Sequence, residues 1–177
     1  EHMVNDKYVM PGTAYIEIIR KIAADYYGFH AISLSDLIFM HPLAVGQNKR
    51  EARMIFTTLD DGILIEIESR EAKSREQESR EQESSRWQMH AKGYLKQAVT
   101  EGRIHSAISD IKQRCKKVGL NDSGNTVEHF VKTGARWNNL RELRLGENEL
   151  LAYLKLDNGY MDSDREYRLH PALLDRA

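Results

Sequence analysis

Apolar and polar residues follow two different periods along the chain, and the first is helical. Within residues 12–27, apolar side chains recur at intervals of three and four residues: Ile16, Ile19, Ala23 and Tyr26. This spacing places them on one face of a helix. Pro11 precedes the segment and Gly28 follows it, as is typical of a helix start and stop. We therefore predict an amphipathic helix close to the beginning of the chain.

Beyond residue 30 the period changes to two, which predicts β-strands. The stretches concerned are residues 31–45, 51–61, 63–71 and 86–98. The first enters a turn at His41-Pro42. The second and third flank Asp61-Gly62, a dipeptide typical of a hairpin tip. In the last strand we expect four inward side chains: Trp87, Met89, Ala91 and Tyr94. The first half is therefore predicted to be one long helix with an antiparallel sheet.

The second half is predicted to mix short helices with a pair of strands. Apolar spacing predicts helices at residues 101–118 and 126–134 and a helix start at 170–177. Residues 140–156 are predicted to form two strands joined near Gly146. Pro171 stands at a helix entry after an extended run, as Pro11 does. This echo suggests that one architecture occurs twice, with the second copy incomplete, and we divide the chain into residues 1–98, a linker 99–125, and residues 126–177.

A polar segment interrupts the strands of the first half. Ser74–Glu78 and Ser79–Glu83 both read Ser-Arg-Glu-Gln-Glu, and the segment contains no apolar residue. Such a repeat is most simply a solvated extension of a hairpin. Docking of a partner is the alternative.

Composition excludes several classes of protein. The formal net charge of the 177 residues is −1, so no overall field attracts nucleic acid or an anionic membrane. No apolar run reaches the about 20 residues that span a bilayer, and we find no signal-peptide pattern. A single cysteine, Cys115, excludes an internal disulfide and a multi-cysteine zinc site. It is more simply a structural thiol than a reactive one. The charge, the missing membrane and signal patterns and the single cysteine together predict a cytoplasmic protein. The histidines show no metal-ligand spacing, so we expect no metal.

Two short motifs resemble those of a known family. "HMVNDKYVMPG" at residues 2–12 resembles the HxxxGxxxxP motif of dehydratase domains from modular polyketide synthases. "HPALLD" at residues 170–175 resembles the HPALLDxxxQ segment of the same domains. "WQMHAKGYL" and "VKTGARWNNL" match further stretches in order and spacing. The resemblance implies an α+β double hot-dog fold, in which antiparallel sheet wraps long central helices, with the second hot-dog incomplete here.

The resemblance also implies a reaction, the removal of water from a 3-hydroxyacyl thioester to give a 2-enoyl thioester. His2 would be the base that takes the C2 proton, and Asp175 the acid that protonates the leaving hydroxyl. The backbone N–H of Gly12, at the helix start, would meet the thioester carbonyl oxygen. Four further residues are expected to bind substrate: Pro11, Tyr8, Met10 and His170. Tyr8 and Met10 line a tunnel or belong to the core, and His170 orients Asp175 or packs.

The chain departs from the family pattern at two inspectable positions. Asp6 stands where the histidine motif has glycine, which is either a neutral turn substitution or a sign of altered chemistry. Trp137 lies at or near the tyrosine of a family segment that contains Tyr-Gly-Pro. Because Asp175 is retained, we favour dehydration over a double-bond isomerase. A pyran-forming cyclase is a second catalytic alternative. A non-catalytic hot-dog docking domain is a third alternative.

The same resemblance implies the partners. The acyl substrate would be carried on the phosphopantetheine of an acyl carrier protein, with no cofactor bound by this chain. Other domains of the synthase would be neighbours, and a homodimer is a further option.

Overall fold

The computed structural model describes residues 2–46, 49–72, 86–99, 107–120, 130–160 and 167–177. The chain divides into two compact units. The first comprises residues 1–5, 11–19 and 100–177, and the second comprises residues 6–10 and 20–99. Helix α1 (Gly12–Tyr27) contributes its first half to one unit and its second half to the other. The division of the sequence at residues 98 and 125 stays a prediction.

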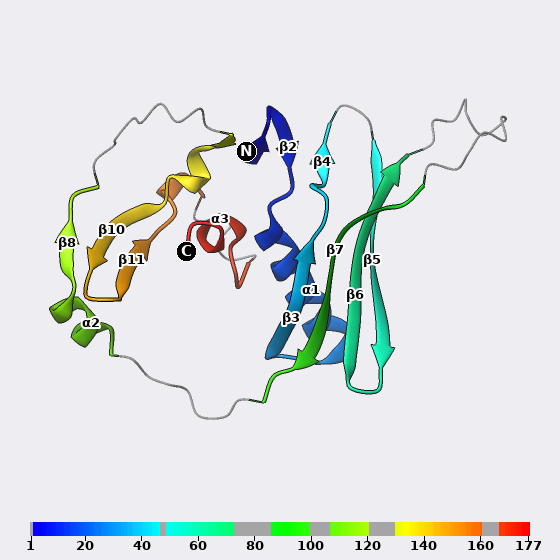
Figure 1. The fold of residues 1–177 in the computed structure, drawn as a ribbon, viewed down its shortest axis with the longest axis horizontal. Coiled ribbons are helices and arrows are strands. Elements are labelled where there is room, and N and C mark those ends of the chain that lie inside the picture. The colour runs from blue at the N-terminus through cyan, green and yellow to red at the C-terminus, as the bar shows by residue number, and fades with distance from the viewer. Residues whose placement is uncertain (1, 47–48, 73–85, 100–106, 121–129, 161–166) are drawn as a thin grey trace. The chain divides into compact units, whose positions relative to one another are not determined.

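The second unit is built on a four-stranded antiparallel sheet in the order β3-β7-β6-β5 (Figure 1). Its strands are β3 (Ile32–Phe39), β5 (Arg50–Leu59), β6 (Gly62–Glu71) and β7 (Gln88–Gln97). A short pair of strands, β2 (Lys7–Val9) and β4 (Ala44–Val45), completes the unit. The strands predicted from the two-residue period are therefore confirmed. The β5–β6 turn consists of Asp60 and Asp61, with Leu59 paired to Gly62, so the tip lies one residue before the predicted Asp61-Gly62.

The core of this unit follows from the alternation along β6. Ile63, Ile65 and Ile67 are each at most 4% exposed, whereas the residues between them are less buried. Other members of this core are Ala23, Leu43, Ala91 and Leu95. On α1 the buried apolar positions are Tyr15, Ile19 and Ala23. The predicted inclusion of Tyr26 on this face is wrong. Tyr26 is 83% exposed, because it lies in the last turn of α1, beyond the buried row with its four-residue step.

A β-bulge explains why the prediction for β7 was only partly right. The register shifts between the pairs Ile67–Ala91 and Glu68–Met89, so His90 is an extra residue on β7. His90 and Ala91 are consequently both buried, whereas Tyr94 is 39% exposed. The ring of His90 lies between Ser69, whose Oγ is 2.7 Å from Nε2, and the carbonyl oxygen of His41, 3.0 Å from Nδ1. Burial lowers the pKa of His90, which agrees with a neutral ring in this position.

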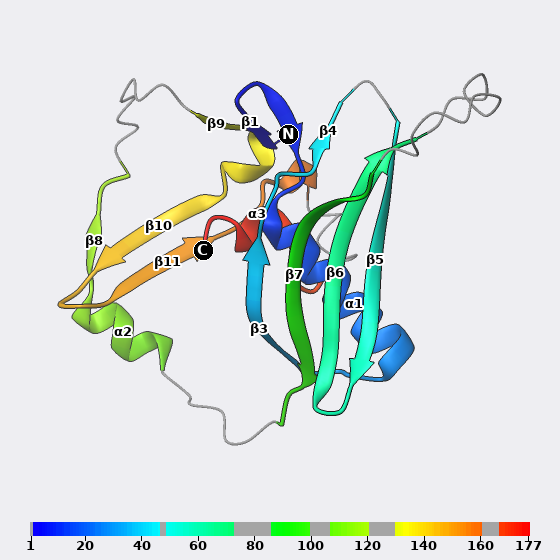
Figure 2. The same ribbon diagram turned by 45° about the vertical axis from the view of Figure 1, so that its right-hand side comes forward.

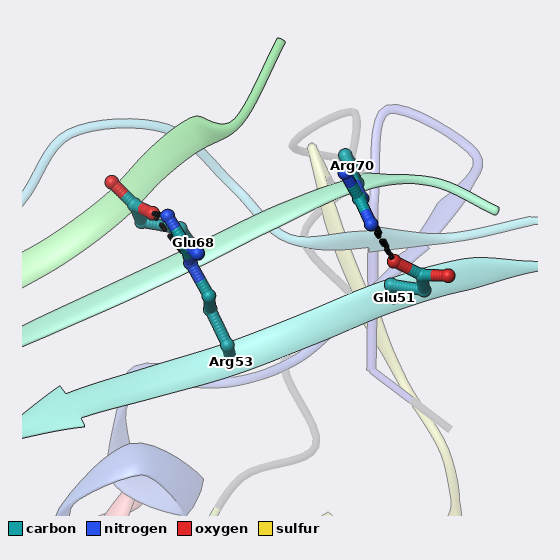
Figure 3. A network of polar contacts seen from close by, with 4 residues as sticks. All are labelled: Glu51, Arg53, Glu68 and Arg70. Carbon is teal, nitrogen blue, oxygen red and sulfur yellow. Dashed lines mark hydrogen bonds and ion pairs between the residues drawn. The ribbon is translucent and has the colours of Figure 1, made fainter. Parts of the chain in front are cut away.

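Charged side chains line the other face of the β5–β6 hairpin (Figure 3). Arg53 bonds Glu68 at 2.8 Å, and Arg70 bonds Glu51 at 2.7 Å, in each case across the two strands. Both guanidinium groups also lie over the ring of Trp87, 3.9 Å and 4.6 Å from its centre. This face of the sheet is therefore covered by paired charges and one aromatic ring.

The first unit contains a three-stranded antiparallel sheet in the order β11-β10-β8 (Figure 2). Its strands are β8 (Lys116–Val118), β10 (Leu140–Leu145) and β11 (Leu150–Leu154). The unit also has the strand pair β1 (His2–Val4) and β9 (Val131–Thr133). Its short helices are α2 (Ile108–Arg114), η2 (Ala135–Trp137), η3 (Asn158–Tyr160) and α3 (Pro171–Leu174). The predicted strands of residues 140–156 and the helix start at Pro171 are confirmed.

Two helix predictions in this unit need correction. The helix predicted for residues 101–118 ends at Arg114, and residues 116–118 form strand β8. Cys115 marks the change, since it is only 2% exposed and packs at the junction. Burial raises the pKa of its thiol, as suits a structural cysteine. Residues 131–133, predicted to be helical, pair with β1 instead. Cross-strand pairing with a distant segment overrides the local helical spacing there.

The Ser-Arg-Glu-Gln-Glu repeat at residues 74–83 lies outside the described residues. Among the described helices, none is long and apolar enough to cross a membrane.

Candidate active site

The two ends of the first unit are brought together by strand pairing and by helix capping. At the N-terminal end, His2 pairs with Thr133 in the β1–β9 ladder, and the N–H of Asn5 bonds the carbonyl of Phe130 at 3.1 Å. Strand β9 leads directly into η2, whose last residue is Trp137. His2 and Trp137 thus lie near each other, and their ring centres are 5.8 Å apart.

At the C-terminal end, helix α3 is shaped by its capping residue. His170 is the N-cap, and its Nδ1 accepts a hydrogen bond from the N–H of Ala172 at 3.2 Å. Pro171 at the first helical position needs no such partner. Asp175 is the C-cap residue, directly after the four helical residues. The short helix therefore sets the direction in which the Asp175 carboxyl leaves the backbone.

The first half of α1 holds the segment that leads into α3. The hydroxyl of Thr13 donates a hydrogen bond to the carbonyl of Pro171 at 3.1 Å. One turn further, the buried carboxylate of Glu17 accepts the backbone N–H groups of Arg168 and Leu169 at 3.1 Å and 3.2 Å. Two consecutive turns of α1 thus form hydrogen bonds with residues 168–171.

His2 and Asp175, which the sequence separates by more than 170 positions, lie side by side in this unit. Nε2 of His2 is 3.9 Å from Oδ2 of Asp175. The same oxygen accepts a hydrogen bond of 2.9 Å from Nε1 of Trp137. The side chains of His2 and Asp175 are 14% and 27% exposed, so both are largely shielded yet reachable from outside. The structure therefore brings an imidazole and a carboxyl together within the reach of one small molecule.

Asn139 connects the elements that carry Trp137 and Asp175. It is 1% exposed, and its amide nitrogen donates to the carbonyls of Arg136 in η2 and Ala172 in α3, at 3.0 Å and 2.8 Å. The carbonyl of Asn139 in turn accepts the N–H of Lys155. The relative position of η2 and α3 is thus fixed by a buried amide.

The remaining predicted site residues are placed as follows. Gly12 begins α1, and the carbonyl of Pro11 accepts the N–H of Ala14 at 3.0 Å. His170 is 7% exposed and caps α3. Tyr8 and Met10 belong to the second unit, where the N–H of Met10 bonds the carbonyl of Leu43 at 3.0 Å. Their substrate-binding roles stay predictions.

The departure at Asp6 has a simple backbone explanation. Asn5 and Asp6 form the turn between β1 and β2, and their φ angles are 50° and 58°. Glycine adopts this left-handed conformation without cost, and asparagine and aspartate tolerate it better than other residues do. Aspartate can therefore take the place of glycine at this turn without changing its course.

Other parts of the unit are less suited to the predicted chemistry. Within the described ranges, no group of three or more His, Cys, Asp or Glu side chains could hold a metal ion. A cavity of about 420 Å³ contains none of the predicted site residues. It is lined by Ile108, Lys112, Glu142, Leu151, Ala152 and Tyr153.

Sequence reasoning missed the residues that hold the pair in place. Thr13, Glu17 and Asn139 carry no motif that announces their contacts, which join segments up to 158 residues apart. Trp137 was noticed only as a departure from the family pattern. Its hydrogen bond to Asp175 could not be read from the sequence.

What the arrangement can do chemically follows from the two groups. A neutral imidazole nitrogen can accept a proton, and a carboxylic acid can donate one. With 3.9 Å between Nε2 and Oδ2, both can reach atoms on adjacent carbons of a bound chain. Removal of a proton from one carbon and of hydroxide from the next is the reaction class that such a pair can serve.

Comparison with known proteins identifies the family. The model of the "polyketide synthase dehydratase domain" matches residues 1–70, and that of the "polyketide synthase dehydratase N-terminal domain" matches residues 105–177. The two matches include both His2 and Asp175. The chain belongs to the dehydratase domains of polyketide synthases, as the two motifs had indicated.

Individual relatives agree with this assignment. The chain is 25% identical over 190 residues to polyketide synthase PksM of Bacillus subtilis (strain 168). This match covers all of the chain and 4% of PksM. An N-terminal dehydratase from the difficidin assembly line is 22% identical, with a TM-score of 0.82 over 99% of the chain. The dehydratase domain from the CurJ module of curacin polyketide synthase is 26% identical, with a TM-score of 0.74 over the same share.

The likeness to these dehydratase structures confirms the predicted α+β double hot-dog fold of the chain. The chain spans 61% of the difficidin dehydratase chain and 57% of the CurJ one. This share agrees with the expectation of an incomplete second hot-dog.

Proposed function

We propose that this chain is the part of a polyketide synthase dehydratase domain that carries both catalytic groups. The reaction is the loss of water from a 3-hydroxyacyl thioester to give a 2-enoyl thioester. The observation that carries the proposal is the distance of 3.9 Å between Nε2 of His2 and Oδ2 of Asp175, at positions that match both family motifs.

In the proposed reaction, Nε2 of His2 accepts the proton from C2 of the substrate. The electron pair of the C2–H bond forms the C2–C3 double bond, and the C3–O bond breaks. Asp175 gives its proton to the departing hydroxide, so that water leaves. The N–H of Gly12, at the start of the 16-residue helix α1, donates to the thioester oxygen as negative charge develops there. Pro11 and His170 stand at the starts of α1 and α3, and we assign them to substrate binding.

The substrate and partners are part of the same proposal. The acyl chain is delivered on the phosphopantetheine arm of an acyl carrier protein, and the other synthase domains supply it and receive the product. The chemistry needs a base, an acid and an oxyanion partner, all of which the protein's own residues provide. It therefore calls for no cofactor in this chain.

The test uses the complete natural polypeptide with a 3-hydroxyacyl thioester on a carrier protein, followed by mass spectrometry of the acyl group. We expect loss of one water from the wild type. We expect none from His2→Ala or Asp175→Asn, with circular dichroism showing that both variants remain folded. Asp175→Asn is the sharper variant, because the amide keeps an acceptor for Trp137 but has no acidic proton to give.

Other outcomes would redirect the assignment. An unchanged mass with a moved double bond or a closed ring would indicate an isomerase or a cyclase. No conversion by the folded wild type would indicate a docking domain. Near-wild-type turnover in either variant would refute the roles given to His2 and Asp175.

A further inference from the structure

The carboxyl of Asp175 has two oxygens, and the structure treats them differently. Oδ2 accepts the Trp137 indole N–H at 2.9 Å and faces Nε2 of His2 at 3.9 Å. For Asp175 to act as an acid, one of the two oxygens must carry a proton at the start of the reaction. The neighbours of Oδ2 decide which one.

Indole is a donor only, since its nitrogen has no lone pair available for a hydrogen bond. If the proton of Asp175 were on Oδ2, it would have to share that side of the carboxyl with the Trp137 N–H. With the proton on Oδ1, Oδ2 is the carbonyl-type oxygen and accepts from Trp137. A tyrosine hydroxyl, present at or near this place in the resembled family segment, could donate or accept and would not make this choice.

We propose, on the basis of the dehydratase function above, that Trp137 is a positioning residue that directs the acidic proton of Asp175 to Oδ1. Oδ1–H then donates to the hydroxyl that leaves C3, and the carboxyl cannot turn that oxygen away without breaking the bond to Trp137. Asn139 supports this arrangement, because it ties η2, which ends in Trp137, to α3, which Asp175 follows.

The same bond gains strength during the reaction. When Asp175 gives up its proton it becomes a carboxylate, and hydrogen bonds to a charged acceptor are about twice as strong as those to a neutral one. Trp137 therefore stabilises the transition state more than the ground state, which affects kcat more than KM. His2, protonated in the same reaction, lies on the same side of the carboxyl.

The kinetic test compares Trp137→Phe with Trp137→His. Phenylalanine keeps an aromatic ring and removes the donor, whereas histidine returns a ring N–H at a similar reach from the backbone. For Trp137→Phe we expect kcat to fall about tenfold, which is about 1.4 kcal/mol of barrier, with KM changed less than about threefold. Trp137→His should recover part of kcat. Trp87→Phe, at the other tryptophan of the chain and in the second unit, is the matched control and should leave both constants unchanged.

A spectroscopic test is independent of turnover. In the ¹⁵N-labelled complete polypeptide, the indole N–H resonances of Trp137 and Trp87 are identified by their disappearance in Trp137→Phe and Trp87→Phe. In Asp175→Leu, which removes the acceptor, the Trp137 indole proton should move upfield, while in Asp175→Asn it should move less. An identical resonance in wild type and Asp175→Leu would overturn the proposal.

The two tests also separate this proposal from the dehydratase function. If Trp137→Phe kept the wild-type kcat, Trp137 would not position Asp175, even though the enzyme is a dehydratase. If the wild type released no water, the dehydratase function would fail, and the indole resonance alone would decide whether Trp137 orients the carboxyl.

Discussion

The hydrogen bonds from α1 to residues 168–171 predict a large loss of stability for a small chemical change, Glu17→Gln. The Glu17 carboxylate is 3% exposed and accepts two backbone N–H groups, one on each oxygen. Glutamine has nearly the same size and similar helix propensity. It keeps one acceptor oxygen but replaces the other with an NH₂ group, which meets a backbone N–H donor.

The magnitude follows from these two bonds. A hydrogen bond to a charged group contributes about 1.5–3 kcal/mol, and a neutral one about 1 kcal/mol. Glu17→Gln loses one charged bond outright and weakens the other to a neutral one. We therefore expect the free energy of unfolding to fall by about 2–4 kcal/mol. For a chain of this size a loss of 3 kcal/mol corresponds to a Tm lower by about 6–12 °C.

Urea unfolding followed by circular dichroism measures this change, with Glu147→Gln as the matched control. Glu147 is exposed in the turn before β11, so the same substitution there should change the free energy of unfolding by less than about 0.5 kcal/mol. Because Glu17 also positions the segment before α3, turnover should fall at temperatures where the variant is still folded. Equal stability of the two variants would refute the reasoning.

Two further predictions concern other parts of the chain. Burial lowers the pKa of His90 in the folded chain. Below about pH 6.5 the unfolded chain therefore binds a proton that the folded chain does not, and the free energy of unfolding decreases as the pH is lowered. Urea unfolding at about pH 7.5 and 5.5 should show a smaller fall in His90→Gln than in wild type, and an equal fall would contradict this. At Gly146, a methyl group would lie 2.9 Å from the Sγ of the buried Cys115 and 2.8 Å from Cγ of Glu149. Gly146→Ala should therefore cost about 1–3 kcal/mol, and Cys115→Ala in the same chain should relieve part of it, a coupling that a double-mutant cycle measures.

The sequence predicted those elements whose pattern is set by near neighbours. The period of two gave the strands of the β3-β7-β6-β5 sheet, and the spacing of three and four gave α1. The sequence-based prediction failed where pairing with a distant strand determines the secondary structure. Residues 131–133 lie in a segment whose apolar spacing predicts a helix, yet they are a strand because β1 pairs with them. The bulge at His90 likewise depends on β6, so the alternation of β7 alone could not reveal it.

The candidate site divides in the same way. His2 and Asp175 stand within motifs, and the resemblance was enough to select them. The residues that bring them together act through backbone groups and single atoms, as Thr13 does on the carbonyl of Pro171. Such contacts leave no spacing or residue pattern, because almost any segment offers a carbonyl. They become visible only when the chain is folded.

The crossed charges of the β5–β6 hairpin have a consequence for how the chain avoids wrong folds. In the native register Arg53 faces Glu68 and Glu51 faces Arg70. If β5 slid by two residues in one direction, Glu51 would face Glu68, and in the other direction Arg53 would face Arg70. Slips of two keep the apolar side chains on the correct face of a sheet, so hydrophobic burial discriminates poorly against them. Repulsion between like charges opposes both slips. In the first it is partly offset, because Arg53 would then face Glu66, whereas in the second Glu51 would face the uncharged Ala72. The charge pattern of this hairpin therefore favours the native register where hydrophobic burial does not.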